Sequence, residues 1–130
     1  MPVKSLFGKA MNAIERTLDI TKFRHGLITS NVSNLDTPGY RTKEIDFYQA
    51  LKDALEGRLV DLTRTHDLHF ETRRGPAETY EITYPERGDW VDIDREMSKL
   101  SENNLRYQTG IEALLRRFSM VRYTITEGGR

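Results

Sequence analysis

The chain has 130 residues, enough for one compact domain with a modest core. Its residues are 37% hydrophobic and include six Tyr, five Phe and one Trp, a composition that excludes a disordered chain. Its formal net charge of zero argues against nucleic-acid binding as the main role. The absence of cysteine excludes disulfides, thiolate zinc sites and cysteine nucleophiles.

Residues 5–35 form the first predicted helix. Nine residues of this helix, which we call its seam, follow one another at steps of four and three. This spacing places them on one face of a helix that packs lengthwise against other helices. Two of them are polar, and neighbouring apolar residues widen the face, so the pattern indicates either several partner surfaces or a bend near residues 21–25. The seam consists of Phe7, Met11, Ile14, Leu18, Thr21, His25, Ile28, Val32 and Leu35.

The segment 34–40, Asn-Leu-Asp-Thr-Pro-Gly-Tyr, ends this helix. Pro38 cannot continue a helix, and Pro38 with Gly39 suits the centre of a type II turn, whose second central residue needs a positive φ. The side chain of Asn34 can bond to nearby backbone groups. We therefore predict a turn built from Asn34, Thr37, Pro38, Gly39 and Tyr40.

The middle of the chain is predicted to hold a short helix and a small extended or β segment. Residues 44–56 carry an apolar face typical of a short amphipathic helix, which Gly57 follows in the place of a helix-ending glycine. Residues 58–88 are rich in Thr, Arg and Glu, and a weak alternation at Tyr80, Ile82 and Tyr84 favours one strand or an extended arm.

The longest predicted helix covers residues 90–126, about 55 Å at about 1.5 Å per residue. Asp92 or Asp94 is expected to cap it. One seam position is polar: Asn104 lies in the middle, where a buried amide can set the register of packed helices at a cost in stability. A 130-residue domain seldom needs so long a helix, so the seam predicts an assembly. The seam consists of Ile93, Met97, Leu100, Asn104, Tyr107, Ile111, Leu114, Phe118, Val121 and Ile125.

These elements divide the chain into an N-terminal helical unit (1–36), a middle unit (37–88) and a C-terminal helical unit (89–130). The N-terminal end lacks the apolar run and the small-residue cleavage site of a secretory signal. No stretch approaches the ~20 apolar residues of a transmembrane helix. A route out of the cytoplasm would therefore need dedicated export machinery.

One pair of histidines, His66 and His69, most resembles a metal or acid–base site. No helix is predicted there, the remaining histidine is the distant His25, and zinc usually takes three or four protein ligands. The sequence also lacks a Gly-rich phosphate loop and a Gly-x-Ser-x-Gly elbow. We therefore expect no enzyme activity, no cofactor and no small-molecule substrate.

Residues 31–41, Asn-Val-Ser-Asn-Leu-Asp-Thr-Pro-Gly-Tyr-Arg, closely resemble the signature of the flagellar rod and hook proteins, with Ser30 where alanine is usual. Within that family the chain looks like a proximal-rod protein, because further segments are similar in the same order. These are residues 44–47, 65–70, 91–97 and 102–107. The likeness spans nearly the whole chain, and the ordered combination is more specific than any one motif.

The resemblance implies a mainly α fold in which the N- and C-terminal helices pack as an antiparallel coiled coil. It implies that many copies form the inner wall of a hollow rod in the flagellar basal body, which spans the periplasm and transmits torque from the membrane ring to the hook. The implied partners are copies of the same chain, other rod proteins, the rod adaptor protein, the membrane-ring protein and, in transit, the flagellar type III export apparatus. No cleaved signal peptide is implied.

The assembly interface is then expected on the two seams. Composition and periodicity fit a coiled-coil adaptor of another secretion apparatus equally well, but the signature around the turn argues against that alternative. A histidine-based metalloenzyme is the second alternative. The residues that we predict to carry the interface are Leu18, Ile28, Val32, Leu35, Leu100, Asn104, Tyr107, Ile111, Leu114 and Phe118.

Overall fold

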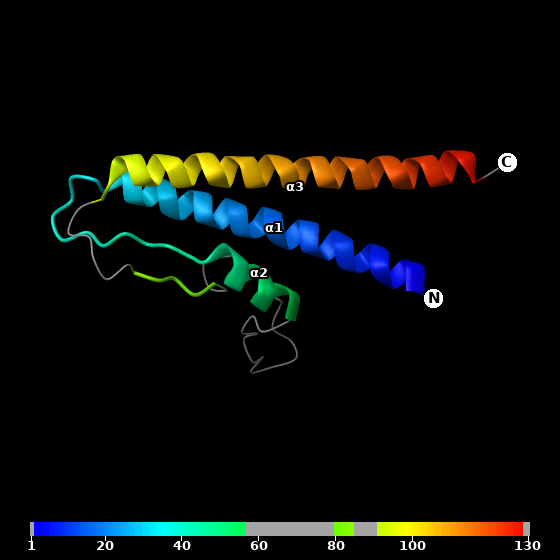
Figure 1. Ribbon diagram of the computed structural model, residues 1–130, viewed down its shortest axis with the longest axis horizontal. Helices are drawn as coiled ribbons and strands as arrows, with labels where there is room; N and C mark the ends of the chain where they lie inside the picture. The colour runs from blue at the N-terminus through cyan, green and yellow to red at the C-terminus, as the bar shows by residue number, and fades with distance from the viewer. Residues whose placement is uncertain (1, 57–79, 85–90, 129–130) are drawn as a thin grey trace, which may run out of the picture.

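The computed structural model describes residues 2–56, 80–84 and 91–128 of the chain. Within these ranges the backbone forms helices α1 (Pro2–Ser33), α2 (Phe47–Glu56) and α3 (Ile93–Glu127) (Figure 1). The predicted mainly α fold, with a long helix towards each end and a short one between them, is confirmed.

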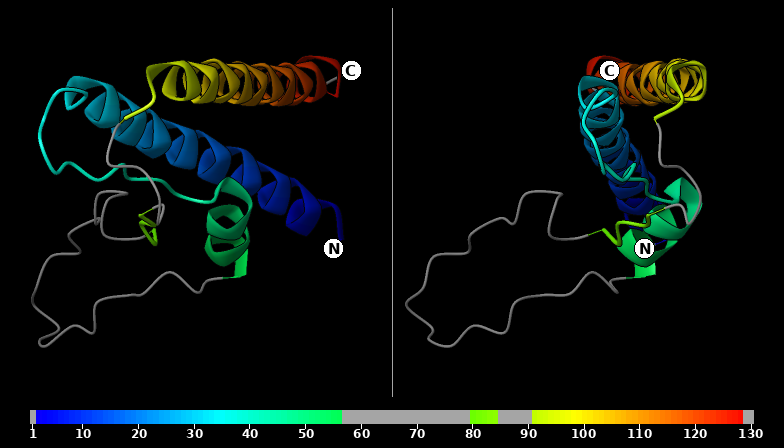
Figure 2. Two further views of the ribbon diagram at one scale, coloured as in Figure 1. Left: turned by 60° about the vertical axis from the view of Figure 1, so that its left-hand side comes forward. Right: turned by 90° about the vertical axis from the view of Figure 1, so that its left-hand side faces the viewer.

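Helices α1 and α3 lie side by side and run in opposite directions (Figures 1 and 2). The contacts follow that direction: Asn31 bonds to Glu96, and Thr21 accepts a bond from Asn103 farther along. The two helices lie close together where α1 ends and α3 begins, and they separate towards the termini (Figure 1). Among the described helices, none has the combination of length and apolar character that a membrane span requires.

The apolar core lies between α1, α2 and residues 80–84, and not between the two long helices. Ile20 and Leu27 of α1 pack there with residues that precede or belong to α2. The rings of Phe23 and Tyr80 lie 5.4 Å apart at a tilted angle, so residues 80–84 close this core. The buried members are Ile20, Leu27, Ile45, Phe47, Ala50 and Tyr80, with Phe23, Leu51 and Ile82 packed against them.

Residues 80–84, predicted as one strand or an extended arm, form no strand in the described part of the chain. In the described residues this segment forms a single antiparallel bridge, in which Glu44 and Thr83 exchange backbone hydrogen bonds of 3.0 and 2.7 Å. The partner segment turns into α2 at Phe47, so the pairing ends before a ladder can form. Local alternation predicted extended backbone but could not predict how far a partner would follow it.

Both later helices begin at an aspartate. Asp92 caps α3, its carboxylate accepting bonds from the backbone N–H groups of Asp94 and Arg95 at 3.0 and 3.2 Å. Asp46 caps α2 in the same way, accepting from the N–H of Gln49 at 2.7 Å. These bonds satisfy amides that a helix start leaves without a partner, and the predicted cap at Asp92 is confirmed.

Candidate functional site

The turn after α1 forms as predicted. Gly39 has a φ of +74°, and the N–H of Tyr40 donates to the carbonyl of Thr37 at 3.2 Å, which closes the turn around Pro38 and Gly39. The hydroxyl of Thr37 donates to the side-chain oxygen of Asn34 at 3.2 Å. Asn34 and Tyr40 are half-buried, whereas the three residues between Asp36 and Tyr40 are exposed.

Asn31 is the centre of this junction and is fully buried. Its amide group donates to the carbonyl of Lys43 and to the carboxylate of Glu96, both at 2.9 Å. Its oxygen accepts from the N–H of Lys43 at 2.9 Å and from the hydroxyl of Tyr40 at 3.1 Å. All four hydrogen-bonding positions of the asparagine are therefore used, and they join α1, the turn and α3.

A buried ion pair continues the network. Glu96 is only 2% exposed, and its second oxygen lies 2.9 Å from the ammonium of Lys99. The same ammonium lies 3.0 Å from Glu44, whose backbone is bridged to Thr83. A buried carboxylate is stable only when its lone pairs are bonded, which Asn31 and Lys99 achieve here.

Farther along, the contact between α1 and α3 remains polar. The side-chain amide of Asn103 donates to the carbonyl of Thr21 at 2.8 Å, and both residues are almost fully buried. Arg24 lies 3.7 Å from Glu102, beside this bond. At Gly110 the helices come so close that an added Cβ would lie 2.8 Å from the Cδ2 of Leu18.

The fully buried residues of α3 lie beside the predicted seam, whose members Leu100, Ile111 and Leu114 are half-buried. These buried residues are Glu96, Asn103 and Gly110, spaced seven apart. Asn104 is exposed in the single chain, and the neighbouring Asn103 is the amide that is buried against α1. The hydrogen bond between Asn31 and Glu96 holds the face of Glu96, Asn103 and Gly110 against α1. A possible role of Asn104 between copies stays a prediction.

The other predicted interface residues fall into three groups by exposure. Ile28 is buried against the rest of the chain, and Tyr107 and Phe118 are exposed. Leu18 is brought against Gly110. The half-buried members are Leu18, Val32, Leu35, Leu100, Ile111 and Leu114.

The outward side of α3 carries a long apolar stripe. Five members of the predicted seam on α3 are between 45% and 72% exposed. Further apolar residues of the same helix are also exposed, so a large apolar area of the single chain faces solvent, which is typical of an interaction surface. The five that define the outer stripe are Ile93, Met97, Tyr107, Phe118 and Ile125; the others are Leu105, Leu115, Met120 and Tyr123.

Sequence reasoning missed the residues that hold the two long helices together. Asn31, Glu96 and Asn103 were not among the predicted interface residues. A signal was present, since Glu96, Asn103 and Gly110 repeat at seven residues directly beside the apolar seam. Polar and glycine residues at such a spacing indicate a second helix face, as apolar residues do.

Arg106 connects α3 to the start of α2. Its guanidinium lies 4.4 Å from the ring centre of Phe47 and 5.2 Å from that of Tyr48. Glu102, one turn earlier, holds the same guanidinium at 2.6 Å. This arrangement places a cation over two aromatic faces and orients α2 against the helix pair.

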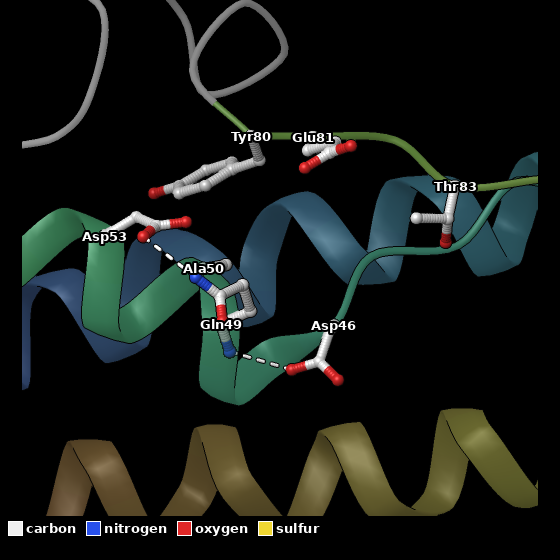
Figure 3. Close-up of a pocket in the computed structure, with 7 residues that line it drawn as sticks. All are labelled: Asp46, Gln49, Ala50, Asp53, Tyr80, Glu81 and Thr83. Carbon is white, nitrogen blue, oxygen red and sulfur yellow. Dashed lines mark hydrogen bonds between the residues drawn. The ribbon is translucent and has the colours of Figure 1, made fainter.

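A small acidic pocket lies over α2, with a volume of about 120 Å³ (Figure 3). Asp46, Asp53 and Tyr80 are among its walls. Its aspartates have structural partners, because Asp46 caps α2 and Asp53 accepts from the side-chain amide of Gln49 at 2.9 Å. The described residues contain no group of three or more His, Asp or Glu side chains placed to hold a metal ion. His66 and His69 lie outside the described residues.

Comparison with known proteins gives a consistent set of relatives. The chain is 33% identical over 116 residues to the flagellar basal body rod protein FlgB of Escherichia coli (strain K12), covering 81% of this chain and 84% of that protein. It is 32% identical over 111 residues to the FlgB of Aeromonas hydrophila, with 82% and 84% covered. The FlgB of Bacillus subtilis (strain 168) is 27% identical over 127 residues, with 95% and 98% covered. No protein-family model matches the chain.

Proposed function

The chain belongs to the FlgB family of flagellar basal body rod proteins, and we propose that it builds the proximal part of the hollow rod that transmits torque from the membrane ring to the hook. As a member of this family it is a structural subunit of the bacterial flagellar basal body. Flagellum-dependent motility would then require it, and its work would consist of forming interfaces, with no catalytic step.

The observation that carries this proposal is the outer stripe of α3. Its five residues stay between 45% and 72% exposed, while α3 meets α1 through polar residues and a glycine. Burying apolar area yields about 25 cal/mol per Å², offset by the entropy of ordering the chain. A stripe that the single chain leaves about half exposed or more is therefore available for packing between subunits.

In the assembled rod, α1 and α3 of each copy act as an antiparallel coiled coil that lines the rod. The rod core would comprise residues 1–36 and 89–130, and residues 37–88 would lie outside it. The turn from Asn34 to Tyr40 directs the chain away from the core. Torque would pass through many such interfaces in parallel, so no single contact needs to be strong.

The proposed partners follow from that position. They are copies of the same chain, other rod proteins, the rod adaptor protein and the membrane-ring protein, with the flagellar export apparatus in transit. We propose a periplasmic location in the rod after export without a cleaved signal peptide. A coiled-coil adaptor of another secretion apparatus is the alternative, and the family membership speaks against it.

The test uses two neighbouring positions on α3. Phe118 belongs to the outer stripe, whereas Ser119 is exposed on the next face and bonds to the carbonyl of Leu115 at 3.0 Å. Phe118→Asp should abolish swimming and the recovery of the protein in purified basal bodies, while the chain is still made. Ser119→Asp should preserve both. Normal swimming and incorporation of the Phe118→Asp variant would contradict an assembly driven by the stripe.

A further inference from the structure

Helix α3 carries two neighbouring heptad-spaced faces. The inward face is Glu96, Asn103 and Gly110. Met97, Phe118 and Ile125 of the outer stripe lie one residue after the heptad of the inward face, whereas Ile93 and Tyr107 lie three residues before it. One residue corresponds to a rotation of about 100° around an α-helix. A separation of three residues corresponds to about 60°, so turning α3 by between about 60° and 100° would present its apolar stripe to α1. Hydrophobicity alone therefore does not select the observed arrangement.

Polar contacts on the inward face select it instead. Glu96 accepts the bond from Asn31, and Asn103 donates to the carbonyl of Thr21. Both bonds are directional, and both would break if α3 rotated by one residue. The glycine at 110 then lets the helices approach, because a Cβ there would collide with Leu18.

The contact between α1 and α3 also contains a feature that packing alone would not retain. The oxygen of Asn103 and one terminal nitrogen of Arg24 are buried and make no hydrogen bond within the described chain. An unpaired buried polar atom lowers stability, and an apolar residue at position 103 would avoid the penalty. A polar residue kept at such a position is a known way to exclude alternative helix packings.

We propose that Glu96 and Asn103 are specificity-determining residues that set the rotation of α3 about its own axis. They hold the polar face against α1 and thereby keep the outer stripe free for a second copy of the chain. The last step rests on the proposed function, whereas the rotation itself is a property of the single chain. An apolar residue at 103 would weaken the selection and make it easier for the stripe to turn inward.

The absence of cysteine makes the rotation measurable by disulfide formation in the isolated chain of 130 residues. The first pair is Leu18→Cys with Gly110→Cys, since a Cβ at 110 lies 3.4 Å from the Cγ of Leu18. The second pair is Leu18→Cys with Ile111→Cys, which reports the rotated packing. We expect the first pair to oxidise at least about tenfold faster, because disulfides form only at short Cβ distances.

The decisive comparison adds a leucine at one of two adjacent positions. Asn103→Leu should reduce the difference between the two oxidation rates by at least about threefold, since one of the two polar contacts that select the rotation is gone. Asn104→Leu is the matched control and should leave the preference for position 110 intact. If Asn103→Leu does not fold by circular dichroism, Asn103→Ala replaces it and should show a partial loss of preference.

An unchanged preference in the Asn103 variant, or no preference in the parent chain, would overturn the proposal. These outcomes are independent of the rod, because no assembly takes place in the measurement. If the rotation responds to Asn103 while Phe118→Asp still enters basal bodies, the rotational setting stands and the outer stripe is not the rod interface. If the Phe118→Asp variant does not enter basal bodies and the Asn103 variant keeps the preference for position 110, the outer stripe is the rod interface and the rotational proposal is wrong.

Discussion

Asn31 of α1 donates a 2.9 Å hydrogen bond to the carboxylate of Glu96 on α3, joining residues that are 65 positions apart, and both side chains are at most 2% exposed. The bond sits where the turn leaves α1 and where α3 begins. Because the asparagine also holds Lys43 and Tyr40, the conformation of the turn and the pairing of the long helices depend on one side chain.

Replacing Asn31 should therefore destabilise the chain more than an average substitution. Asn31→Leu leaves the Glu96 carboxylate and both backbone groups of Lys43 without this partner, and we expect a loss of about 2–4 kcal/mol in the free energy of unfolding. Urea unfolding followed by circular dichroism measures it. Asn12→Leu, at an exposed position of the same helix, should change stability by less than about 0.5 kcal/mol. Equal losses in the free energy of unfolding for the two variants would show that Asn31 has no special role in stability.

Two helical glycines should respond differently to the same substitution. A Cβ at Gly26 meets nothing within 4 Å, so Gly26→Ala should stabilise α1 by up to about 1 kcal/mol through helix propensity. A Cβ at Gly110 would lie 2.8 Å from a methyl of Leu18, so Gly110→Ala should force that side chain to shift, and this cost should offset the gain in helix propensity. Thermal unfolding of both variants measures the difference, and equal stabilisation by the two substitutions would show that α3 is not in contact with Leu18 at position 110.

The turn should tolerate little change at Gly39. Its φ of +74° is easy for glycine and strained for a residue with a Cβ, so Gly39→Ala should cost about 1 kcal/mol in the free energy of unfolding. Gly39→Asn should cost less, because asparagine enters this region more readily. Chemical denaturation of the two variants provides the ranking. The opposite order would mean that the turn does not depend on a positive φ.

Tyr80 should make the fold sensitive to alkaline pH. Burial raises the pKa of its hydroxyl above the usual value, Asp19 raises it further, and Arg16 partly offsets the rise. The folded chain therefore keeps the proton while the unfolded chain releases it near about pH 10. The unfolded state then binds fewer protons, so the free energy of unfolding falls as pH rises above about 10.

The measurement is urea unfolding between about pH 9 and pH 11, where the unfolded phenol ionises. Tyr80→Phe should flatten the decline relative to the parent chain. Tyr123→Phe, at an exposed position on α3, should leave the parent slope unchanged. An identical slope in the parent and in Tyr80→Phe would show that another group causes the loss.

The sequence by itself determined the helices, the cap at Asp92 and the turn at Gly39, because each depends on steric and hydrogen-bonding preferences within a few residues. The heptad period showed that α3 has an apolar stripe. It could not show which neighbour would cover that stripe, since the same period serves packing within a chain and between chains.

Only the tertiary structure decided which face of α3 meets α1. Asn103 and Asn104 are the same amino acid with the same helix propensity, but Asn103 is buried and Asn104 is exposed. The difference arises because Glu96 reaches a partner that lies 65 residues away in the chain. Contacts of that separation exist only after the chain has folded. The local pattern therefore predicted a seam on α3, and the tertiary structure left five of its apolar residues exposed.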